Sequence, residues 1–386
     1  MQARLIAAAL LPSLFLAACG GGSNSPRAVD TPVATNNDGS PVTGVITARF
    51  DPSNAVIPFP TNLLLSGTTD LTLNIPVTDP SNFGDPRVAM NAQDGFGAVS
   101  PWVTGFSVPV KASSVVAGSS VRVFQVTLTG PGGGVTGVTR ELTPNVDYVA
   151  TLASPQQLAI VPLKPLQQLT SYMAVLTDNI TDSRGNDATP DQTYFLAQTR
   201  TPLCINGVSQ QPLLPNATAC ALEPLRQLTN SQEAAAASAG VNASQIVLTW
   251  VATVQSITPV LGAVQQRAAA TPATATQIVP TGMNLSNLNP ALPPIADVYV
   301  GSLELPYYQT APTATECTAT TPCPPLTKFW RAAPGAYIPP FAGMLDPTST
   351  FVTFANPLPI ATSTQKVPLV LTVPNAASGQ SRPPTG

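Results

Sequence analysis

Short stretches in which apolar and polar residues alternate dominate the middle of this chain of 386 residues. In 121–128, Phe124, Val126 and Leu128 fall on one face, with Arg122 aligned near the strand end. This period of two is typical of a strand that buries one side. Further strand candidates are 148–152, 158–163 and 172–176. Regularly spaced short strands over about 100 residues predict a β-sandwich between 100 and 201.

A different pattern follows the sandwich. Residues 221–238 contain a run of alanines with glutamate and arginine, which predicts a helix that stops at Gly240. Residues 246–254 carry apolar or β-branched side chains on both faces. A strand of this kind is expected to lie in the centre of a sheet and to be covered on both sides.

The last third is expected to begin with another helix. Thr258 and Pro259 fit a helix start, because proline suits the first helical position. Apolar residues at helical spacing predict its buried stripe; they are Val260, Leu261, Val264 and Ala268. Residues 268–277 are rich in alanine, threonine and proline and are interpreted as a linker. A last strand is predicted at 366–374, where Val367, Leu369, Leu371 and Val373 share one face.

Composition narrows the class of protein. Charged residues are only 9% of the chain, far below the roughly 25% of an average soluble protein, while apolar residues are 44%. This composition argues against general disorder, which requires high charge and low hydrophobicity. Together with 43 prolines and 26 glycines, this suits a β-rich extracellular protein with many turns. A net charge of −3 gives no reason to expect nucleic acid as a partner.

The N-terminus predicts export and lipidation. Residues 5–18 are apolar but too few to span a bilayer, and Leu16-Ala17-Ala18-Cys19 fits a bacterial lipobox. The expectation is a lipoprotein signal peptide over 1–19, with Cys19 as the lipid-attachment residue and a membrane as partner through the acyl chains. An ordinary signal peptide cleaved nearby is the alternative. Gly20 follows the cysteine in place of aspartate, which favours the outer membrane. Residues 20–44 are interpreted as a flexible tether.

The remaining four cysteines predict disulfides. Cys204, Cys220, Cys317 and Cys323 are an even number in an exported chain, and four cysteines allow three connectivities. Proximity in sequence favours Cys204 with Cys220 and Cys317 with Cys323. A metal site is the rival interpretation and is a poor one, because the chain has no histidine and no paired C-x-x-C spacing. No metal and no cofactor are expected.

The stretch from Phe50 to Trp102 resembles the opening of the bacterial virulence-factor lipase family. The family pattern "F-x-P … I-P-F-P-N-x-L … G-T-x-D-G-T-L-N-I-P … D-P … A-L-N-x-x-D-G-F" is matched in order by Phe50, Pro52, Ile57 to Pro60, Asn62, Leu63, Gly67 to Asp70, Thr72 to Pro76, Asp85, Pro86, and Asp94 to Phe96. Leu71 stands where the family usually has glycine, and Met90 where it usually has leucine. Later matches are Ile246 to Trp250, Thr253, Ser256 and Ile257, interpreted as packing residues, and the segments 297–308, 329–332 and 367–375.

Two segments resemble bacterial Ig-like domains. Leu166 to Tyr172 is similar to their "L-x-P-x-T-x-Y" corner, in which the tyrosine hydroxyl bonds to backbone. Residues 182–186 are similar to their "D-x-x-G-N" hairpin turn. Calcium is an alternative ligand for Asp178, Asp182, Asn186 and Asp187, but the oxygen ligands do not alternate ahead of the glycine, so a plain turn is favoured.

The family resemblance implies chemistry that this sequence does not contain. Lipases of the family hydrolyse acyl esters in an α/β-hydrolase domain with an activated serine, a base and a carboxylate. No G-x-S-x-G pentapeptide, no S-x-x-K motif and no histidine occur here, so no residue is assigned a catalytic role. Glu304, Asp297 and Asp346 are carboxylates in strand or turn contexts. The exposed pair Tyr307 and Tyr308 is a candidate for lipid contact, with packing as the alternative.

The expected fold class is mainly β with some α: an Ig-like β-sandwich and a small α/β segment, ending in the first strands of an incomplete α/β-hydrolase sheet. The expected divisions are 1–19 signal peptide, 20–44 tether, 45–201 β-rich region, 202–270 helix-strand-helix segment, 271–294 linker and 295–386 start of a hydrolase region. A truncated gene product or a split reading frame is inferred. The favoured hypothesis is the non-catalytic N-terminal region of an outer-membrane-anchored lipase, whose lipid substrate is reached only through the missing domain. The alternatives are a free-standing surface lipoprotein with an Ig-like adhesion module, and a hydrolase with a non-standard base.

Overall fold

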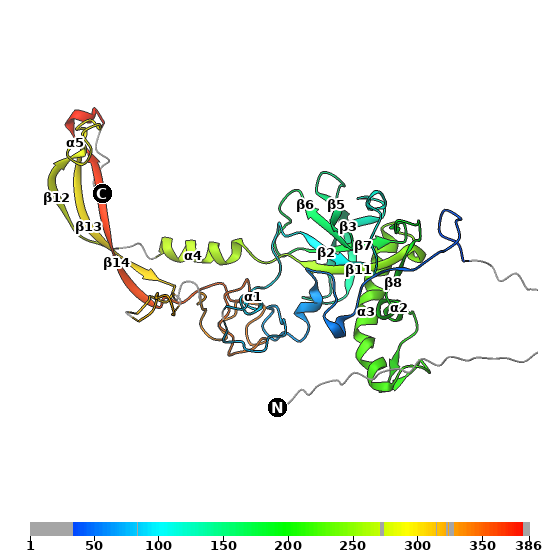
Figure 1. Ribbon diagram of the computed structural model, residues 1–386. Coiled ribbons are helices and arrows are strands. Elements are labelled where there is room, and N and C mark those ends of the chain that lie inside the picture. Colours follow the sequence, from blue (N-terminus) through cyan, green and yellow to red (C-terminus); the bar gives the residue numbers. More distant parts are fainter. Residues whose placement is uncertain are drawn as a thin grey trace, which may run out of the picture.

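The computed structural model describes residues 34–82, 84–270, 274–313, 315–321, 323 and 328–380. The described chain is mainly β, with several small sheets and shorter helical segments (Figure 1). Cys19, the signal peptide and most of the expected tether lie outside the described residues.

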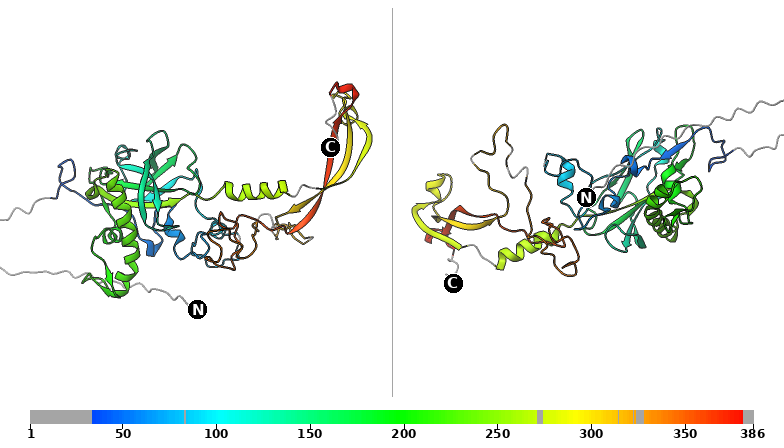
Figure 2. Two further views of the ribbon diagram at one scale, coloured as in Figure 1. Left: turned by 180° about the vertical axis from the view of Figure 1, so that it is seen from behind. Right: turned by 90° about the horizontal axis from the view of Figure 1, so that it is seen from below.

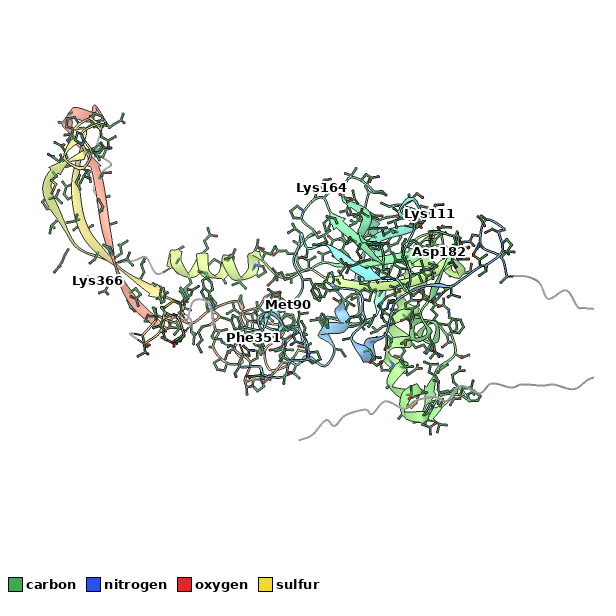
Figure 3. All side chains as sticks on the ribbon, in the orientation of Figure 1. Met90, Lys111, Lys164, Asp182, Phe351 and Lys366 are labelled. Carbon is green, nitrogen blue, oxygen red and sulfur yellow. A yellow bond between two sulfur atoms is a disulfide. The ribbon has the colours of Figure 1, made fainter. Side chains whose placement is uncertain are left out.

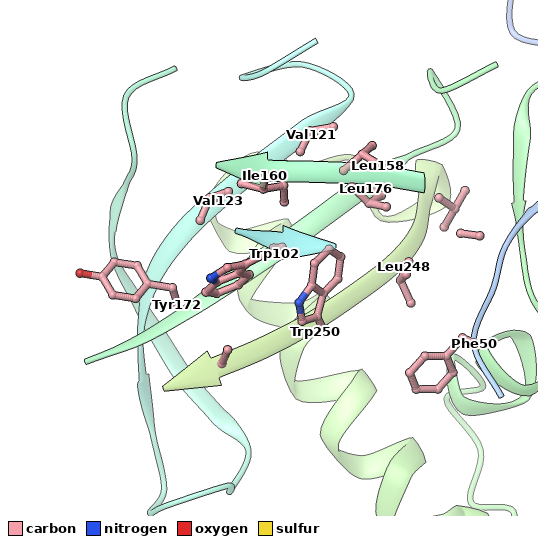
Figure 4. Packing of buried hydrophobic residues seen from close by; sticks show 14 of the residues in the cluster. Phe50, Trp102, Val121, Val123, Leu158, Ile160, Tyr172, Leu176, Leu248 and Trp250 are labelled. Atoms are coloured by element: carbon pink, nitrogen blue, oxygen red, sulfur yellow. The ribbon is translucent and has the colours of Figure 1, made fainter. Parts of the chain in front are cut away.

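Two sheets pack face to face and enclose the main core. One sheet has the order β11-β7-β3-β4, and the other has the order β2-β6-β5. Their strands are β2 (Trp102–Gly105), β3 (Val121–Leu128), β4 (Val135–Glu141), β5 (Tyr148–Ser154), β6 (Gln157–Pro162), β7 (Ser171–Thr177) and β11 (Ile246–Thr253). The alternation in the sequence predicted β3, β5, β6 and β7 within a few residues. Trp102 and Trp250 meet between the sheets with ring centroids 6.2 Å apart (Figure 4).

A long helix covers the outer face of the four-stranded sheet. Helix α3 (Asn216–Ser238) begins five residues before its predicted start, contains Pro224, and ends just ahead of Gly240, whose φ is +79°. Phe124 and Val126 of β3 point to this side and pack in a second core with residues of α3 such as Ala236. Apolar burial on both sides of the sheet explains why every residue of β7 is buried.

Strand β11 is covered on both faces as expected, but its predicted central position is wrong. β11 pairs only with β7 and forms the edge of its sheet. Side chains take the place of a neighbouring strand: the Tyr194 hydroxyl accepts a hydrogen bond from the Thr249 N–H at 2.9 Å, and Asn62 Oδ1 accepts one from the Thr253 N–H at 2.8 Å. The N–H groups of Thr249 and Thr253 on the open edge of β11 are therefore hydrogen-bonded, although the strand has only one strand partner.

Two local turns fold as the sequence indicated. The Tyr172 hydroxyl accepts a hydrogen bond from the backbone N–H of Gln167, five residues upstream. In the 182–186 turn, Asp182 Oδ1 accepts from the N–H groups of Arg184 and Asn186, and Oδ2 accepts from Asn186 Nδ2. Asp182 is thus used to close a turn. Within the described part of the chain, no group of three or more metal-binding side chains gathers here or elsewhere.

Shorter elements connect these layers. They are β1 (Ile46–Ala48), which pairs in parallel with β8 (Ala188–Pro190), the two-stranded pair β9 (Cys204–Ile205) and β10 (Val208–Ser209), the helices α1 (Pro86–Met90) and α2 (Gln192–Ala197), and the 3-10 turns at Pro52–Asn54, Asn62–Leu65, Ala112–Ser114, Ala243–Gln245 and Ala376–Ser378. The stretch from Phe50 to Trp102 is built mainly of turns and extended pieces, as its prolines and glycines indicated.

Helix α4 (Thr258–Ala270) leads away from the two packed sheets toward a third sheet (Figures 1 and 2). The helix starts where Thr258 and Pro259 predicted. The expectation of a buried stripe is wrong, because no residue of α4 is buried and Leu261 is 58% exposed. Helical spacing shows that a helix has an apolar side, but it does not show that another element covers that side.

The third sheet has the order β12-β13-β14 and is antiparallel throughout. Its strands are β12 (Thr274–Asn284), β13 (Ala296–Tyr307) and β14 (Ser363–Pro374), and the short helix α5 (Leu285–Leu288) joins the first two. Strand β14 contains the strand predicted at 366–374, and β13 covers most of the segment 297–308 that resembles the family. The predicted linker over 271–294 is wrong for 274–284, since these residues form β12 and pair with β13. Their alanines, threonines and prolines do not show a strand pattern, and the partner strand follows later in the chain.

Candidate functional site

Asp94 joins three segments that are far apart in the sequence. This carboxylate is 8% exposed. Its Oδ1 accepts the Ser256 N–H at 2.8 Å, while Oδ2 accepts the Ser256 hydroxyl at 2.5 Å and the Phe354 N–H at 3.0 Å. The connection between β11 and α4 and the loop that contains Phe354 are therefore fixed to the same side chain. We call this contact the Asp94 anchor.

Gly95 and Phe96 extend the anchor through backbone contacts. Phe96 donates to the Thr253 carbonyl and accepts from the Gln255 N–H, both at 2.9 Å. A Cβ atom on Gly95 would lie 2.7 Å from Gln255 N and from the Thr253 carbonyl oxygen. Only glycine allows this approach, because real Cβ atoms do not come so close to backbone atoms. The Asp-Gly-Phe sequence is thus a structural clamp on the end of β11.

A second contact of the same type lies at Asp70. Its carboxylate accepts from the Thr72 N–H and hydroxyl, and from the Ser349 hydroxyl at 2.6 Å. The next residue, Leu71, has φ +67°. Glycine adopts this left-handed conformation without strain, whereas other residues do so at a cost of about 1–2 kcal/mol. The left-handed backbone therefore explains why the family pattern has glycine at this position, where this chain has leucine.

The Ser256–Asp94 pair does not have the chemistry of a catalytic serine. A serine nucleophile must give its proton to a base that later returns it to the leaving group, and this role usually belongs to histidine. The chain contains no histidine. The Ser256 hydroxyl donates to a carboxylate that also accepts two backbone N–H groups, so the pair holds segments together. Its geometry indicates a structural role.

Two hollows with apolar walls flank α4. The larger, about 790 Å³, lies between α4 and residues 338–358, and we call it the α4 groove. It is lined by Thr258, Pro259, Gly262, Ala263, Gln266, Arg267 and Ala270 of the helix and by Ile338, Phe354, Pro357 and Leu358. The smaller, about 330 Å³, lies beside Asp94 and Ser256 and includes Leu261, Phe329, Trp330 and Phe351 among its walls. Figure 3 shows the side chains of this region around the labels of Met90 and Phe351.

A buried polar cluster between α2, α3 and β11 is separate from both hollows. Glu233 is 3% exposed, accepts from Gln198 Nε2 at 2.8 Å and from the Tyr194 hydroxyl at 3.3 Å, and pairs with Arg200 at 3.4 Å. Burial is the main cause that raises the pKa of Glu233, and burial likewise raises the pKa of Tyr194. Since Tyr194 also caps the edge of β11, this cluster serves packing of the fold.

A family comparison decides the relationship of the chain. Residues 47–283 match the model of the bacterial virulence factor lipase N-terminal family. The chain belongs to this family. No protein with curated annotation matches it. The match includes the Asp94 anchor up to Ser256 and all of α4, so the lipase N-terminal region contains most of the geometry described above.

The structure joins the four predicted cysteines in two disulfides, of which only the first lies within the residues that match the family. Cys204 is joined to Cys220, and Cys317 to Cys323, which are the pairs that proximity favours. The first bond ties the β9–β10 pair to the first turns of α3. Cys19, the expected lipid-attachment residue, lies outside the described residues. None of the described helices is both long and apolar enough to cross a membrane.

Other candidates have packing contacts. The ring of Tyr308 lies beside that of Trp330, tilted by 43° with centroids 5.7 Å apart, and both tyrosines of the predicted pair are half-buried. Asp346 accepts from the N–H and hydroxyl of Thr348 within a turn. Sequence reasoning did not identify Asp94 as an anchor or Arg267 as part of a groove. The apolar spacing along α4 marked Val260 and Leu261, which line the smaller hollow, and gave no signal for the groove on another side of the helix.

Proposed function

We propose that this chain is the non-catalytic N-terminal region of an outer-membrane-anchored bacterial lipase. Acyl ester hydrolysis then resides in a separate α/β-hydrolase domain, which joins this region at the sheet β12-β13-β14. Membership of the lipase N-terminal family supports the link to a lipase. The observation that carries the proposal is the state of the third sheet.

Both faces of this sheet carry exposed apolar side chains. On one face, Val279 pairs with Val300 and Val300 with Val370, and these side chains are 49%, 39% and 63% exposed. On the other face, Tyr299 pairs with Leu371, which is 39% exposed, and Leu303 pairs with Val367, which is 38% exposed. In α/β proteins, helices cover both faces of a mostly parallel sheet, which can carry antiparallel strands at an edge. Apolar side chains on both faces of this antiparallel sheet fit such an edge. We therefore interpret the third sheet as the beginning of a hydrolase sheet.

The edge of β14 is the proposed point of continuation. Among the described residues, no strand pairs with the side of β14 that faces away from β13. An open edge presents backbone N–H and C=O groups to a further strand. Adding hydrolase strands there, with their helices, would cover the apolar faces and satisfy these groups in one step.

Two further parts of the proposal concern the rest of the chain. We interpret the two packed sheets as an Ig-like sandwich that holds the catalytic domain at a distance from the membrane; the Tyr172 corner and the Asp182 turn support this interpretation. Cys19 is the proposed lipid-attachment residue and gives the membrane as partner. Labelling cells with radioactive palmitate tests the anchor, since Cys19→Ser is expected to abolish incorporation and an equally labelled variant would contradict it.

Hydrogen exchange on the purified full chain with Cys19→Ser tests the function. Amides of β14 are expected to exchange far faster than those of β7, and to become protected when an α/β-hydrolase domain of the same lipase family is added. In parallel, short- and long-chain p-nitrophenyl esters are expected to show no turnover above buffer. Inhibitor-sensitive turnover by the isolated chain would overturn the non-catalytic role. Protection of β14 as strong as that of β7 in the isolated chain would instead favour a free-standing adhesion module.

A further inference from the structure

We infer that the α4 groove binds the hydrocarbon chain of a single free fatty acid and that Arg267 binds its carboxylate. This inference goes beyond the proposed function, because it gives this region a ligand site of its own. Only the biological role of the site rests on the proposed function, since free fatty acids are the products that ester hydrolysis releases.

The dimensions of the groove suit one acyl chain. Its volume of about 790 Å³ lies within the range of roughly 300–1,000 Å³ in which proteins bind small organic ligands. The lining residues run from Thr258 to Ala270, which at a rise of 1.5 Å per residue gives a length of about 18 Å. One leaflet of a bilayer, half of the roughly 30 Å hydrocarbon core, is about 15 Å thick, so the groove accommodates an extended chain of membrane lipid length.

The walls are apolar on both sides. On the loop side, Ile338 and Leu358 are 42% exposed each, and Phe354 lies beside them. On the helix side, Gly262 and Ala263 present almost no side chain, and no atom lies within 4 Å of a Cβ placed on Gly262. Large apolar side chains facing small ones leave a channel whose burial by a hydrocarbon chain is favourable at about 25 cal/mol per Å².

Charge gives the site a direction. Arg267 lies near the end of α4 and uses one donor, Nη1, for the Pro359 carbonyl at 3.4 Å. Guanidinium has five N–H donors, and no carboxylate in the described part of the chain forms an ion pair with this one. Phe354, on the opposite wall, donates its N–H to the carboxylate of Asp94, a residue that does not line the groove. An anionic head group is therefore attracted to the Arg267 end of the groove.

A fatty acid fits this arrangement better than a phospholipid. One guanidinium offers two parallel N–H groups to one carboxylate, which is the geometry of the strongest charge-assisted hydrogen bonds. A single channel takes one chain, whereas a phospholipid brings two chains and a bulkier head group.

Binding is measured on the full chain with Cys19→Ser, which is purified without detergent so that no amphiphile fills the groove beforehand. The fluorescent fatty acid cis-parinarate is titrated and then displaced with oleate, oleyl alcohol or dodecyltrimethylammonium. We expect saturable binding of one cis-parinarate per chain and displacement by oleate at concentrations at least tenfold lower than by either of the other two.

Two variants locate the site. Arg267→Ala is expected to weaken oleate binding about tenfold, the effect of losing one charge-assisted contact. Gly262→Leu is expected to abolish binding by filling the channel, and it folds because leucine favours a helix interior more than glycine does. Arg184→Ala is the matched control: it removes the same charge from an exposed turn and is expected to leave binding unchanged.

Several results would overturn the inference. They are the absence of saturable oleate binding, equal affinity for oleate and oleyl alcohol, unchanged binding in both Arg267→Ala and Gly262→Leu, and binding to phosphatidylglycerol vesicles without binding of oleate. No ester is present in these titrations, so their failure leaves the proposed lipase role standing. Conversely, ester turnover by the isolated chain would reject the proposed role without affecting this binding result.

Discussion

Replacing Asp94 by asparagine should release the loop around Phe354 while leaving the two packed sheets folded. The carboxylate accepts the Ser256 N–H on one oxygen and the Phe354 N–H on the other. An asparagine side chain has only one acceptor oxygen, so either orientation of the amide places an NH₂ group against one backbone N–H. The Ser256 hydroxyl can adapt, because it is both donor and acceptor.

The magnitude follows from this one lost acceptor. A buried donor left unsatisfied costs about 1–3 kcal/mol, so about 2 kcal/mol is expected for Asp94→Asn. Asp94→Ala removes the acceptor for three donors and is expected to cost about 3–5 kcal/mol. The main cores contain neither Ser256 nor Phe354, which is why the loss should be local.

Hydrogen exchange separates local from global effects. In Asp94→Asn the Phe354 amide is expected to exchange about 30-fold faster, the factor that corresponds to 2 kcal/mol. The amides of β7 should keep their rates. Urea unfolding followed by far-ultraviolet circular dichroism gives the global stability.

The matched control is Asp79→Asn. Asp79 also accepts an N–H and a hydroxyl, both from Ser81, but in an exposed turn. No measurable change is expected there. If Asp94→Asn leaves Phe354 exchange at the wild-type rate, the anchor does not hold this loop and the reasoning is wrong. Faster exchange throughout β7 would equally refute the local character of the effect.

Three further predictions concern stability. Because burial raises the pKa of Glu233, its ionisation opposes folding, and the free energy of unfolding falls as pH rises above about 4.5. In urea titrations, the free energy of unfolding of Glu233→Gln should therefore increase relative to the wild type between pH 4 and pH 8. A relative decrease over this range would contradict the prediction. Replacing Cys204 and Cys220 by alanine should cost about 3 kcal/mol, seen as a lower Tm; an unchanged Tm would show that this loop is not limiting. Leu71→Gly should change the free energy of unfolding by less than about 1 kcal/mol, since relief at φ +67° offsets lost burial, and a loss above 2 kcal/mol would speak against that.

The sequence predicted those elements whose periodicity reflects local burial. Strand β3 alternates in part, whereas β7 is buried along its whole length between a core and a covering layer, and the bounds of both were predicted within a few residues. The edge position of β11 could not be predicted from its own residues. Its neighbours there are side chains, Tyr194 and Asn62, that come from segments 55 and 191 residues away.

The candidate site was harder to predict than the strands for the same reason. Asp94 belongs to a recognisable Asp-Gly-Phe motif, but its partners follow 162 and 260 residues later. The spacing of apolar residues on α4 predicted the helix correctly. It gave no information about Ile338 and Leu358, which face the helix across an open groove and do not bury it.

The bond between Asp94 and Phe354 sets an order for folding. The N-terminal segment leaves the ribosome long before residue 354 is available. Until then the second oxygen of Asp94 can bond only to the Ser256 hydroxyl or to water, and Asp70 likewise waits for Ser349. Closing loops of this length is slow, and exposed apolar surface persists meanwhile. The contacts that hold the N-terminal segment in place are therefore completed only after the C-terminal residues have folded against it.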